Sequence, residues 1–320
     1  MPSETTAPPA TVPTGPAPTA EQGPAPAVGV GARRGRLAGL PRPFIVAVVT
    51  DRDPAAALAT MRLARLEGAH AAELNLPLLA DADPAAFGAA LRGAGVVPYV
   101  TCRRRAFMAV YGVDPATLPA WSDEERMVRQ LAAIDLGARA IDIEMDTFDP
   151  RPAPPLGTPA ALAFATTPGD PAEWSHDPAA ISRQREVIAR AHQAGADVIV
   201  SCHTGRPCSA DTLVAIAADA VARGADLVKI VSPCPARGDL SALLEANTRC
   251  AQTLPVPVAI VGAGAAGDFS RLLGTHFGAG WAIAQLTLTP GGFHPQPLIA
   301  QVRETLRLVP WRAESDAPCA

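Results

Sequence analysis

The feature that most constrains the fold is a regular alternation of short apolar segments with longer amphipathic ones, from Phe44 to Leu308. The short segments have the length and β-branched content of buried strands, and the longer ones have helical periodicity. The predicted strands cover residues 44–50, 71–76, 96–102, 140–145, 197–202, 227–231, 256–261 and 281–286. The predicted helices cover residues 54–67, 84–92, 123–136, 178–194, 209–223, 240–253, 268–273 and 297–308.

Eight strand–helix units in succession predict a parallel sheet, because a parallel connection needs a crossover helix. Eight units over about 270 residues fit a closed barrel better than an open, doubly wound sheet. Glycines stand where helices should end, for example Gly68, Gly137 and Gly224. The sequence therefore predicts an α/β protein with a (β/α)8 TIM-barrel fold, whose chemistry belongs at the carboxyl ends of the strands.

The segments outside this alternation are distinct in composition. Residues 1–40 form a Pro/Ala-rich N-terminal extension with almost no large apolar side chain. We expect it to be disordered, because it buries too little apolar surface to offset the entropy lost on ordering. The barrel domain is expected at 41–312 and a short C-terminal tail at 313–320. A proline-rich insertion at about 147–177 follows the fourth predicted strand, which places it over the barrel mouth as a lid or wall.

Composition excludes several classes of partner. The chain has 27 basic and 31 acidic residues, a net charge of −4, and no basic patch interleaved with aromatic residues, so no nucleic acid partner is expected. No apolar run approaches the roughly 18–20 residues of a membrane helix, so no membrane association is expected. The six cysteines lack a repeated spacing, which favours reduced thiols in a cytoplasmic protein. Barrels of this kind often form homodimers, but no exposed apolar stripe marks an interface here.

Lys229 is the one lysine in the chain, and it lies inside an apolar predicted strand. The other 26 of the 27 basic residues are arginines. A lysine in an apolar strand is costly to bury unless its charge is paired or lost, and such groups concentrate at active sites. An amine can lose its proton and attack a carbonyl, which a guanidinium cannot do. Lys229 is therefore the leading candidate for a nucleophile.

Strand alternation predicts which side chains share the barrel interior with Lys229. Residues two apart lie on the same face of a strand, and charged residues are poorly placed on the face that packs against helices. Parity and charge together assign six further polar side chains to the barrel mouth: Glu73 and Asn75, Arg103, Asp142 and Glu144, and His203.

The same parity turns Cys102 and Cys202 outward, toward the helices. A zinc site built from Cys202, His203, Cys208 and Cys234 would therefore lose one of its ligands, and the spacing matches no recurrent structural zinc pattern. We expect no metal and no other cofactor.

Four motifs resemble those of the type I 3-dehydroquinate dehydratases, lysine-dependent (β/α)8 enzymes of the shikimate pathway and so of aromatic amino acid biosynthesis. They are Ala140-Ile141-Asp142-Ile143-Glu144, Val200-Ser201-Cys202-His203, Ala225-Asp226-Leu227-Val228-Lys229-Ile230, and Phe269-Ser270-Arg271-Leu272 followed by Phe277-Gly278. Each motif is short, but their order and spacing agree from Phe44 to Leu308.

The resemblance implies roles for residues at the matching positions. Lys229 would form a Schiff base with the substrate ketone, His203 would be the general acid/base, and Glu144 would orient its imidazole. Arg271 would hold the substrate carboxylate through a bidentate pair. Glu73 and Arg103 would line the site.

The sequence also departs from the family pattern, mainly in the residues that would bind substrate. Asn75 stands where the family has a second arginine, and a family glutamate after the third strand is missing. The last loop, usually Pro-Gly-Gln, ends in Gly292, and His294 or Gln296 would have to replace the glutamine. The catalytic lysine and histidine are retained, while the substrate-binding residues around them differ.

These observations lead to one principal hypothesis and two alternatives. The principal one is a cofactor-free Schiff-base lyase, a dehydratase that removes water from 3-dehydroquinate or a closely related cyclic keto acid. The first alternative keeps the imine but breaks another bond, as in a class I aldolase-like enzyme acting on a related polyol or keto acid in specialised metabolism. The second is a catalytically silent barrel that binds a small acid or a partner protein.

Overall fold

The computed structural model describes residues 37–308, except 152, 155–158, 168 and 289–295. Contacts divide the chain into Met1–Ala32, which lies outside the described residues, and Arg33–Ala320, which contains the barrel. The expected disorder of the N-terminal extension therefore concerns mostly undescribed residues, and the expected C-terminal tail lies wholly outside the described ones.

The described residues form eight strands: β1 (Phe44–Val49), β2 (Ala71–Asn75), β3 (Val97–Thr101), β4 (Ala140–Glu144), β5 (Asp197–His203), β6 (Leu227–Pro233), β7 (Val258–Ala263) and β8 (Trp281–Ala284). The helices are α1 (Pro54–Glu67), α2 (Pro84–Gly93), α3 (Asp123–Leu136), α4 (Pro159–Thr166), α5 (Pro178–Gln193), α6 (Ala210–Arg223), α7 (Arg237–Thr253), α8 (Gly267–Leu273) and α9 (Ile299–Leu308). Short 3-10 helices lie at η1 (Leu37–Gly39), η2 (Leu76–Leu79), η3 (Arg105–Tyr111), η4 (Pro115–Thr117) and η5 (Gly274–Phe277).

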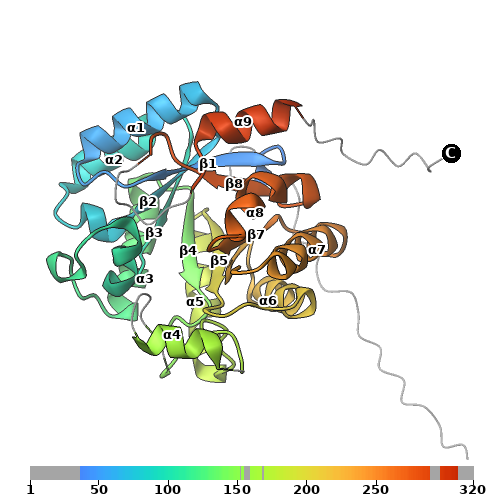
Figure 1. The fold of residues 1–320 in the computed structure, drawn as a ribbon. Coiled ribbons are helices and arrows are strands. Elements are labelled where there is room, and N and C mark those ends of the chain that lie inside the picture. Colours follow the sequence, from blue (N-terminus) through green and yellow to red (C-terminus); the bar gives the residue numbers. More distant parts are fainter. Residues whose placement is uncertain (1–36, 152, 155–158, 168, 289–295, 309–320) are drawn as a thin grey trace, which may run out of the picture. The chain divides into compact units, whose positions relative to one another are not determined.

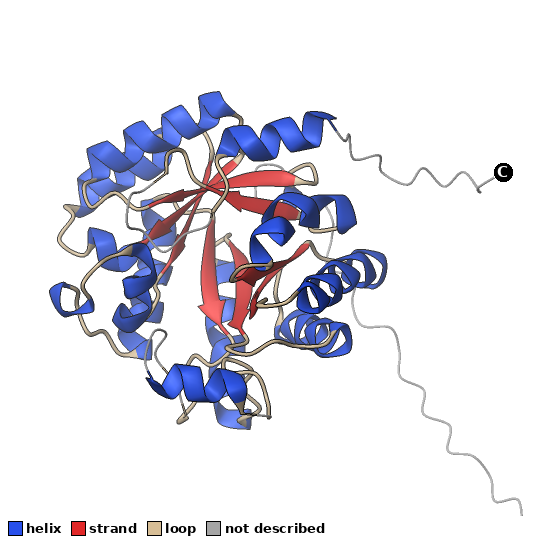
Figure 2. Cartoon of the chain, in the orientation of Figure 1, coloured by secondary structure: helices blue, strands red, loops and turns tan. Residues whose placement is uncertain are grey.

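The strands form a single parallel sheet in the order β7-β6-β5-β4-β3-β2-β1-β8, and helices lie around it (Figures 1 and 2). This is a nearly closed TIM barrel, which confirms the predicted fold. No ladder is formed between β7 and β8 among the described residues, although the Gly280 N–H donates to the Val258 carbonyl at 2.7 Å where the two strands begin.

The predicted strand at 256–261 begins two residues later in the structure, at Val258. Pro255 and Pro257 flank Val256, and a proline has no N–H to donate to a ladder, which explains the later start. Residues 37–40 also differ from the expected disorder, because they include η1 and the side chain of Leu37 is buried. Leu37 packs with Phe44 and Trp281 inside the barrel, so its apolar surface favours ordering of this segment.

The core has an inner and an outer layer, as strand alternation predicts. Inside the barrel, Tyr99, Ile199 and Leu227 pack in one cluster with the stacked rings of Phe44 and Trp281. Cys102 and Cys202 belong instead to the larger cluster that the strands form with the helices. A zinc site that needs the thiol of Cys202 beside His203 is thus disfavoured by the direction of the side chain.

Helix α3 illustrates how local sequence places a functional side chain. Its first turn is fixed by a capping box, in which Ser122 accepts from the Glu125 N–H at 3.2 Å and Glu125 accepts from the Ser122 N–H at 2.8 Å. The helix can therefore present Arg126, one residue later, to the barrel interior. The Arg126 guanidinium is almost fully buried and reaches the Cys102 carbonyl at the end of β3.

The insertion between β4 and α5 contains α4. This helix lies on the same side of the barrel as the carboxyl end of β5 (Figure 1). The Ala172 N–H donates to the Thr204 carbonyl at 2.8 Å, so the insertion contacts the chain directly after His203. Among the described residues, no helix combines the length and the apolar character needed to cross a membrane.

Candidate active site

Lys229 lies in the middle of β6, opposite Ser201 of β5 and Ala259 of β7. Its side chain is nearly buried, and Nζ lies 3.1 Å from Oε2 of Glu73 on β2. The Tyr99 hydroxyl donates to the same oxygen at 2.6 Å. The sole lysine of the chain is thus paired with one buried carboxylate across the barrel.

The protonation of this group of residues follows from its charges. Burial opposes ionisation of Glu73, but the charges of Lys229 and Arg103 and the Tyr99 hydroxyl hold its pKa below the ordinary value. Burial and the Glu73 carboxylate raise the pKa of Tyr99 well above its ordinary value, so the phenol keeps its proton and donates. Glu73 is therefore an anion beside Nζ.

His203 is the last residue of β5, and its ring is held from two sides. Its Nδ1 lies 2.8 Å from Oε2 of Glu173, and its own backbone N–H donates to that same oxygen at 2.7 Å. The Phe107 ring of η3 lies at 4.8 Å between centroids. Burial, with the charges of Arg103 and Lys229, lowers the pKa of His203 to about 3. The imidazole is consequently neutral at neutral pH and able to accept a proton.

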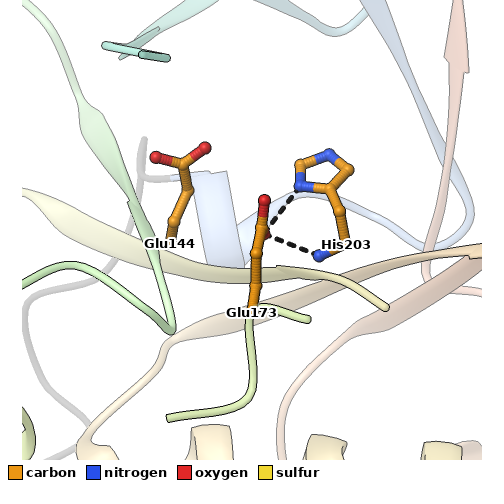
Figure 3. Close-up of side chains that lie close together, drawn as sticks. All are labelled: Glu144, Glu173 and His203. Atoms are coloured by element: carbon orange, nitrogen blue, oxygen red, sulfur yellow. Dashed lines mark hydrogen bonds and ion pairs between the residues drawn. The ribbon is translucent and has the colours of Figure 1, made fainter. Parts of the chain in front are cut away.

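Glu144 was expected to orient this imidazole, but the structure gives its carboxylate other partners. Oε1 pairs with Arg103 at 3.0 Å, and Oε2 pairs with Arg126 of α3. Figure 3 shows that Glu173, not Glu144, is hydrogen-bonded to the backbone nitrogen and to Nδ1 of His203. Burial opposes ionisation of Glu144, yet the charges of Arg126, Arg103 and Arg104 hold its pKa well below the ordinary value. Two arginines therefore account for the direction that this carboxylate takes.

Arg103 occupies the barrel interior below the pocket mouth. Nη2 donates to Asp142 at 2.6 Å and Nη1 to Ser201 at 3.0 Å, while Ser201 donates to the other Asp142 oxygen at 2.6 Å. With Glu144 as a further partner, its guanidinium is engaged by protein groups and is not among the described residues that line the pocket. Its expected contact with the substrate stays a prediction.

One pocket contains both Lys229 and His203. It is lined by Phe107, Val110, Tyr111, His203, Gly205, Lys229, Val231, Pro233, Ala263, Arg271, Ile283 and Gln296. The apolar members form most of its wall, so the few polar groups must determine how a ligand is oriented.

Arg271 of α8 is the guanidinium of this pocket. Its side chain is buried, and this burial lowers the pKa of Arg271 to about 10. Nη1 donates to the side-chain oxygen Oε1 of Gln296 at 2.9 Å, and Nε has no partner among the described residues. No carboxylate of the described chain pairs with Arg271, which leaves a buried cation suited to an acidic ligand.

The remaining substrate-binding candidates are placed less directly. Asn75 is buried at the end of β2, where its side-chain oxygen accepts from the Arg103 N–H at 3.4 Å and its Nδ2 has no partner among the described residues. Gly292 and His294 lie outside the described residues. Gln296 is the proposed replacement that the structure places in the pocket, beside Arg271.

Glu144, Glu173 and His203 are close enough together to suggest a cation site, with their ligand atoms within 4.8 Å of one another. However, both Glu144 oxygens are paired with arginines, and Glu173 Oε2 is bonded to His203. These contacts fit a hydrogen-bonded network better than a metal centre.

Glu173 is the site residue that sequence reasoning missed. It lies in the proline-rich insertion, where no strand or helix period indicates the direction of a side chain. The available signal was weak: a carboxylate within an insertion already expected to stand over the mouth.

Comparison with known proteins bears on the identity of this site. The family model described as Type I 3-dehydroquinase matches residues 45–310. The chain belongs to this family. The resemblance drawn from four sequence motifs is thereby confirmed, and membership of the type I 3-dehydroquinase family makes the protein a hydro-lyase, a class of carbon–oxygen lyase.

Solved structures of 3-dehydroquinate dehydratases share the fold of this family member. The Clostridium difficile type I enzyme with covalently modified comenic acid has a TM-score of 0.63 at 17 % identity, covering 85 % of this chain and 94 % of that one. The Geobacillus kaustophilus enzyme has a TM-score of 0.63 at 20 % identity, covering 83 % and 91 %. The Enterococcus faecalis enzyme has a TM-score of 0.60 at 18 % identity, covering 84 % and 95 %. A search of curated proteins gives no significant sequence match.

Proposed function

We propose that this enzyme dehydrates 3-dehydroquinate, or a closely related cyclic keto acid, through an imine formed on Lys229. The observation that carries the proposal is the content of one pocket: the single lysine, a neutral imidazole and a buried arginine that no carboxylate of the described residues pairs with. Family membership supports the dehydration and the acid nature of the substrate. The imine and the individual roles rest on the geometry.

The reaction begins at the amine. Deprotonated Lys229 attacks the ketone carbon, the oxygen takes one proton from the amine and one from solvent and leaves as water, and a protonated imine remains. Glu73, 3.1 Å from Nζ, is placed to be the counter-ion of this cation. A cationic imine withdraws electrons and acidifies the hydrogen on the neighbouring carbon.

His203 carries the proton through the elimination. Its neutral ring removes the acidified proton, giving an enamine, and the resulting imidazolium returns a proton to the hydroxyl one carbon further away, which leaves as water. Hydrolysis of the conjugated imine restores Lys229 and releases the enone. One water is lost overall, and no oxidant or reductant is needed.

Arg271 orients the substrate by holding its carboxylate. Gln296 accepts from one guanidinium nitrogen, and Nε, which has no partner in the part of the chain that the structure describes, is left as a donor for the acid. The apolar wall around it strengthens this ion pair by excluding water.

The deciding experiment is borohydride trapping with 3-dehydroquinate, read by intact mass and peptide mapping, while enone absorbance is followed in parallel. We expect an adduct on Lys229 and enone formation, and loss of both in Lys229→Met. A trapped ketone without enone would support the aldolase-like alternative. A Lys229→Met protein that retains turnover would overturn the proposal. Unchanged ligand affinity in Lys229→Met, with no turnover by the wild type, would indicate the silent barrel.

A further inference from the structure

The insertion is fastened to the short segment that follows His203. Ala172 donates to the Thr204 carbonyl, and the Arg206 guanidinium lies 3.8 Å over the Phe164 ring of α4 while donating to the Thr167 carbonyl. Gly205 lies between these contacts with φ +67°, and a Cβ there would stand 2.9 Å from the Ala172 Cβ. The insertion thus packs on residues 203–206 at several adjacent points.

Glu173 is the residue that these contacts bring to the imidazole. It is 6 % exposed, and one of its carboxylate oxygens meets both the backbone N–H and Nδ1 of His203. The other buried carboxylates nearby are engaged by arginines: Glu144 by Arg103 and Arg126, and Asp142 by Arg103. Within the described residues, Glu173 is the carboxylate in hydrogen-bond contact with the ring.

We propose that Glu173 is the positioning residue of His203, so that the insertion supplies part of the catalytic apparatus and is not only a cover for the pocket. This inference rests on the proposed function, in which His203 moves the proton. Ionised Glu173 accepts from Nδ1–H, which leaves Nε2 unprotonated as the base. The same carboxylate then stabilises the imidazolium that forms when Nε2 takes the proton. Because Glu173 touches His203 and not the pocket's lysine, its loss should slow proton transfer without preventing imine formation.

The test compares Glu173→Gln with Glu173→Asp and with Asp170→Asn, which removes an exposed carboxylate from the same insertion. Glutamine keeps the length and an acceptor for the backbone N–H but cannot ionise. We expect kcat to fall about 10²-fold in Glu173→Gln, the low end of what a general base contributes. KM should change little, and borohydride should still trap the adduct on Lys229. Glu173→Asp should recover part of kcat, and Asp170→Asn should match the wild type.

The pH profile adds a readout that a merely structural role would not move. Burial and the Glu144 charge raise the pKa of Glu173 to about 8, while the nearby charges of Arg103 and Arg104 act in the opposite direction. Asp146 faces the same group and Lys229 faces the ring. We therefore expect kcat/KM of the wild type to rise between about pH 7 and 9, and this limb to be lost in Glu173→Gln.

A substrate-independent measurement separates this inference from the proposed function. Nitrogen-15 NMR of the His203 ring, assigned by comparison with His203→Asn, reports the tautomer directly. At pH 9 we expect the Nδ1–H form in the wild type and its loss in Glu173→Leu, which removes the acceptor for Nδ1–H. An Nε2–H ring in the wild type at that pH, or unaltered kcat and pH profile in Glu173→Gln, would overturn the inference. Absence of adduct and turnover in the wild type, with the Nδ1–H form present, would instead overturn the proposed function and leave the positioning contact established.

Discussion

Glu73 Oε2 accepts hydrogen bonds from both Nζ of Lys229, at 3.1 Å, and the hydroxyl of Tyr99, at 2.6 Å. Two donors, one from β3 and one from β6, therefore converge on a single oxygen of a β2 side chain inside the barrel. Tyr99 uses its one proton here, so the carboxylate is fixed in direction before any substrate arrives.

Replacing Glu73 by Gln should destabilise the protein and slow the reaction. Breaking a buried pair leaves Lys229 uncompensated, at a cost of about 3 kcal/mol in the free energy of unfolding. The proposed cationic imine would also lose its counter-ion, so kcat should fall at least about tenfold. Urea denaturation and steady-state kinetics test the two effects. Tyr99→Phe is the matched control, expected to cost only about 1 kcal/mol. Equal effects of the two variants would contradict a special role for the charge.

Replacing Arg271 by Lys should weaken substrate binding more than catalysis. Lysine keeps a charge but cannot make a bidentate pair with a carboxylate. We expect KM to rise about tenfold or more, corresponding to the roughly 1.5–3 kcal/mol of a charge-assisted hydrogen bond. Steady-state kinetics on 3-dehydroquinate give the comparison. Gln296→Ala, which removes only a partner of the guanidinium, should have a smaller effect. A drop in kcat at constant KM would place Arg271 in the chemical step.

The pH dependence of stability should differ between the wild type and Glu173→Gln. Burial, with repulsion from Glu144, raises the pKa of Glu173 to about 8, above the value of an unfolded glutamate. The folded protein therefore binds more protons than the unfolded one between about pH 4.5 and 8, and this contribution to stability is lost as pH rises through 8. Glu173→Gln has no ionisable group at this position, so its stability does not fall in this way as pH rises. Chemical denaturation from pH 5 to 9 should show the stability of Glu173→Gln increasing relative to the wild type as pH rises. A stability difference between the two proteins that stays constant with pH would indicate that the pKa of Glu173 is that of an ordinary glutamate.

Gly205→Ala should impair the enzyme by displacing the insertion. The new Cβ would stand 2.9 Å from Ala172 and 3.1 Å from the Phe164 ring, at a φ of +67° that side chains rarely adopt. We expect a stability loss of about 1 kcal/mol or more and a reduced kcat, because Glu173 follows Ala172 directly. Thermal unfolding and kinetics measure both. Gly238→Ala is the control, since a Cβ there meets nothing within 4 Å; an equally harmful control would remove the structural explanation.

The barrel and most of the candidate residues could be predicted because strands impose strict rules. Alternation assigned Lys229, His203 and Glu144 to the interior, and β5 and β6 place Lys229 and His203 on one pocket. Strand alternation does not predict which side chains from distant parts of the chain form ion pairs. The direction of the Glu144 carboxylate depends on Arg126, which reaches in from a helix, and a helical period indicates only which face is buried.

Glu173 shows the other limit of sequence reasoning. Its place follows from contacts between an irregular segment and residues 203–206, and no local pattern encodes those contacts. Strand alternation placed Arg103 in the barrel interior, but it did not predict the ion pair of Arg103 with Asp142. Parity gives the face of the sheet on which a side chain lies, and does not say which group on that face it contacts.

The missing ladder between β7 and β8 makes the barrel mechanically asymmetric. Arg271 follows β7 and Gln296 follows β8, so the two residues proposed to bind the substrate's acid group stand on either side of this seam, where the described strands form no ladder. Lys229 and His203 stand on strands that are paired on both sides. At the pocket end of this seam no ladder hydrogen bond has to break to admit a ligand of different size, since the bond from Gly280 to the Val258 carbonyl lies at the other end, where the two strands begin. In such an architecture, the choice of ligand can drift during evolution while the reacting groups keep their spacing.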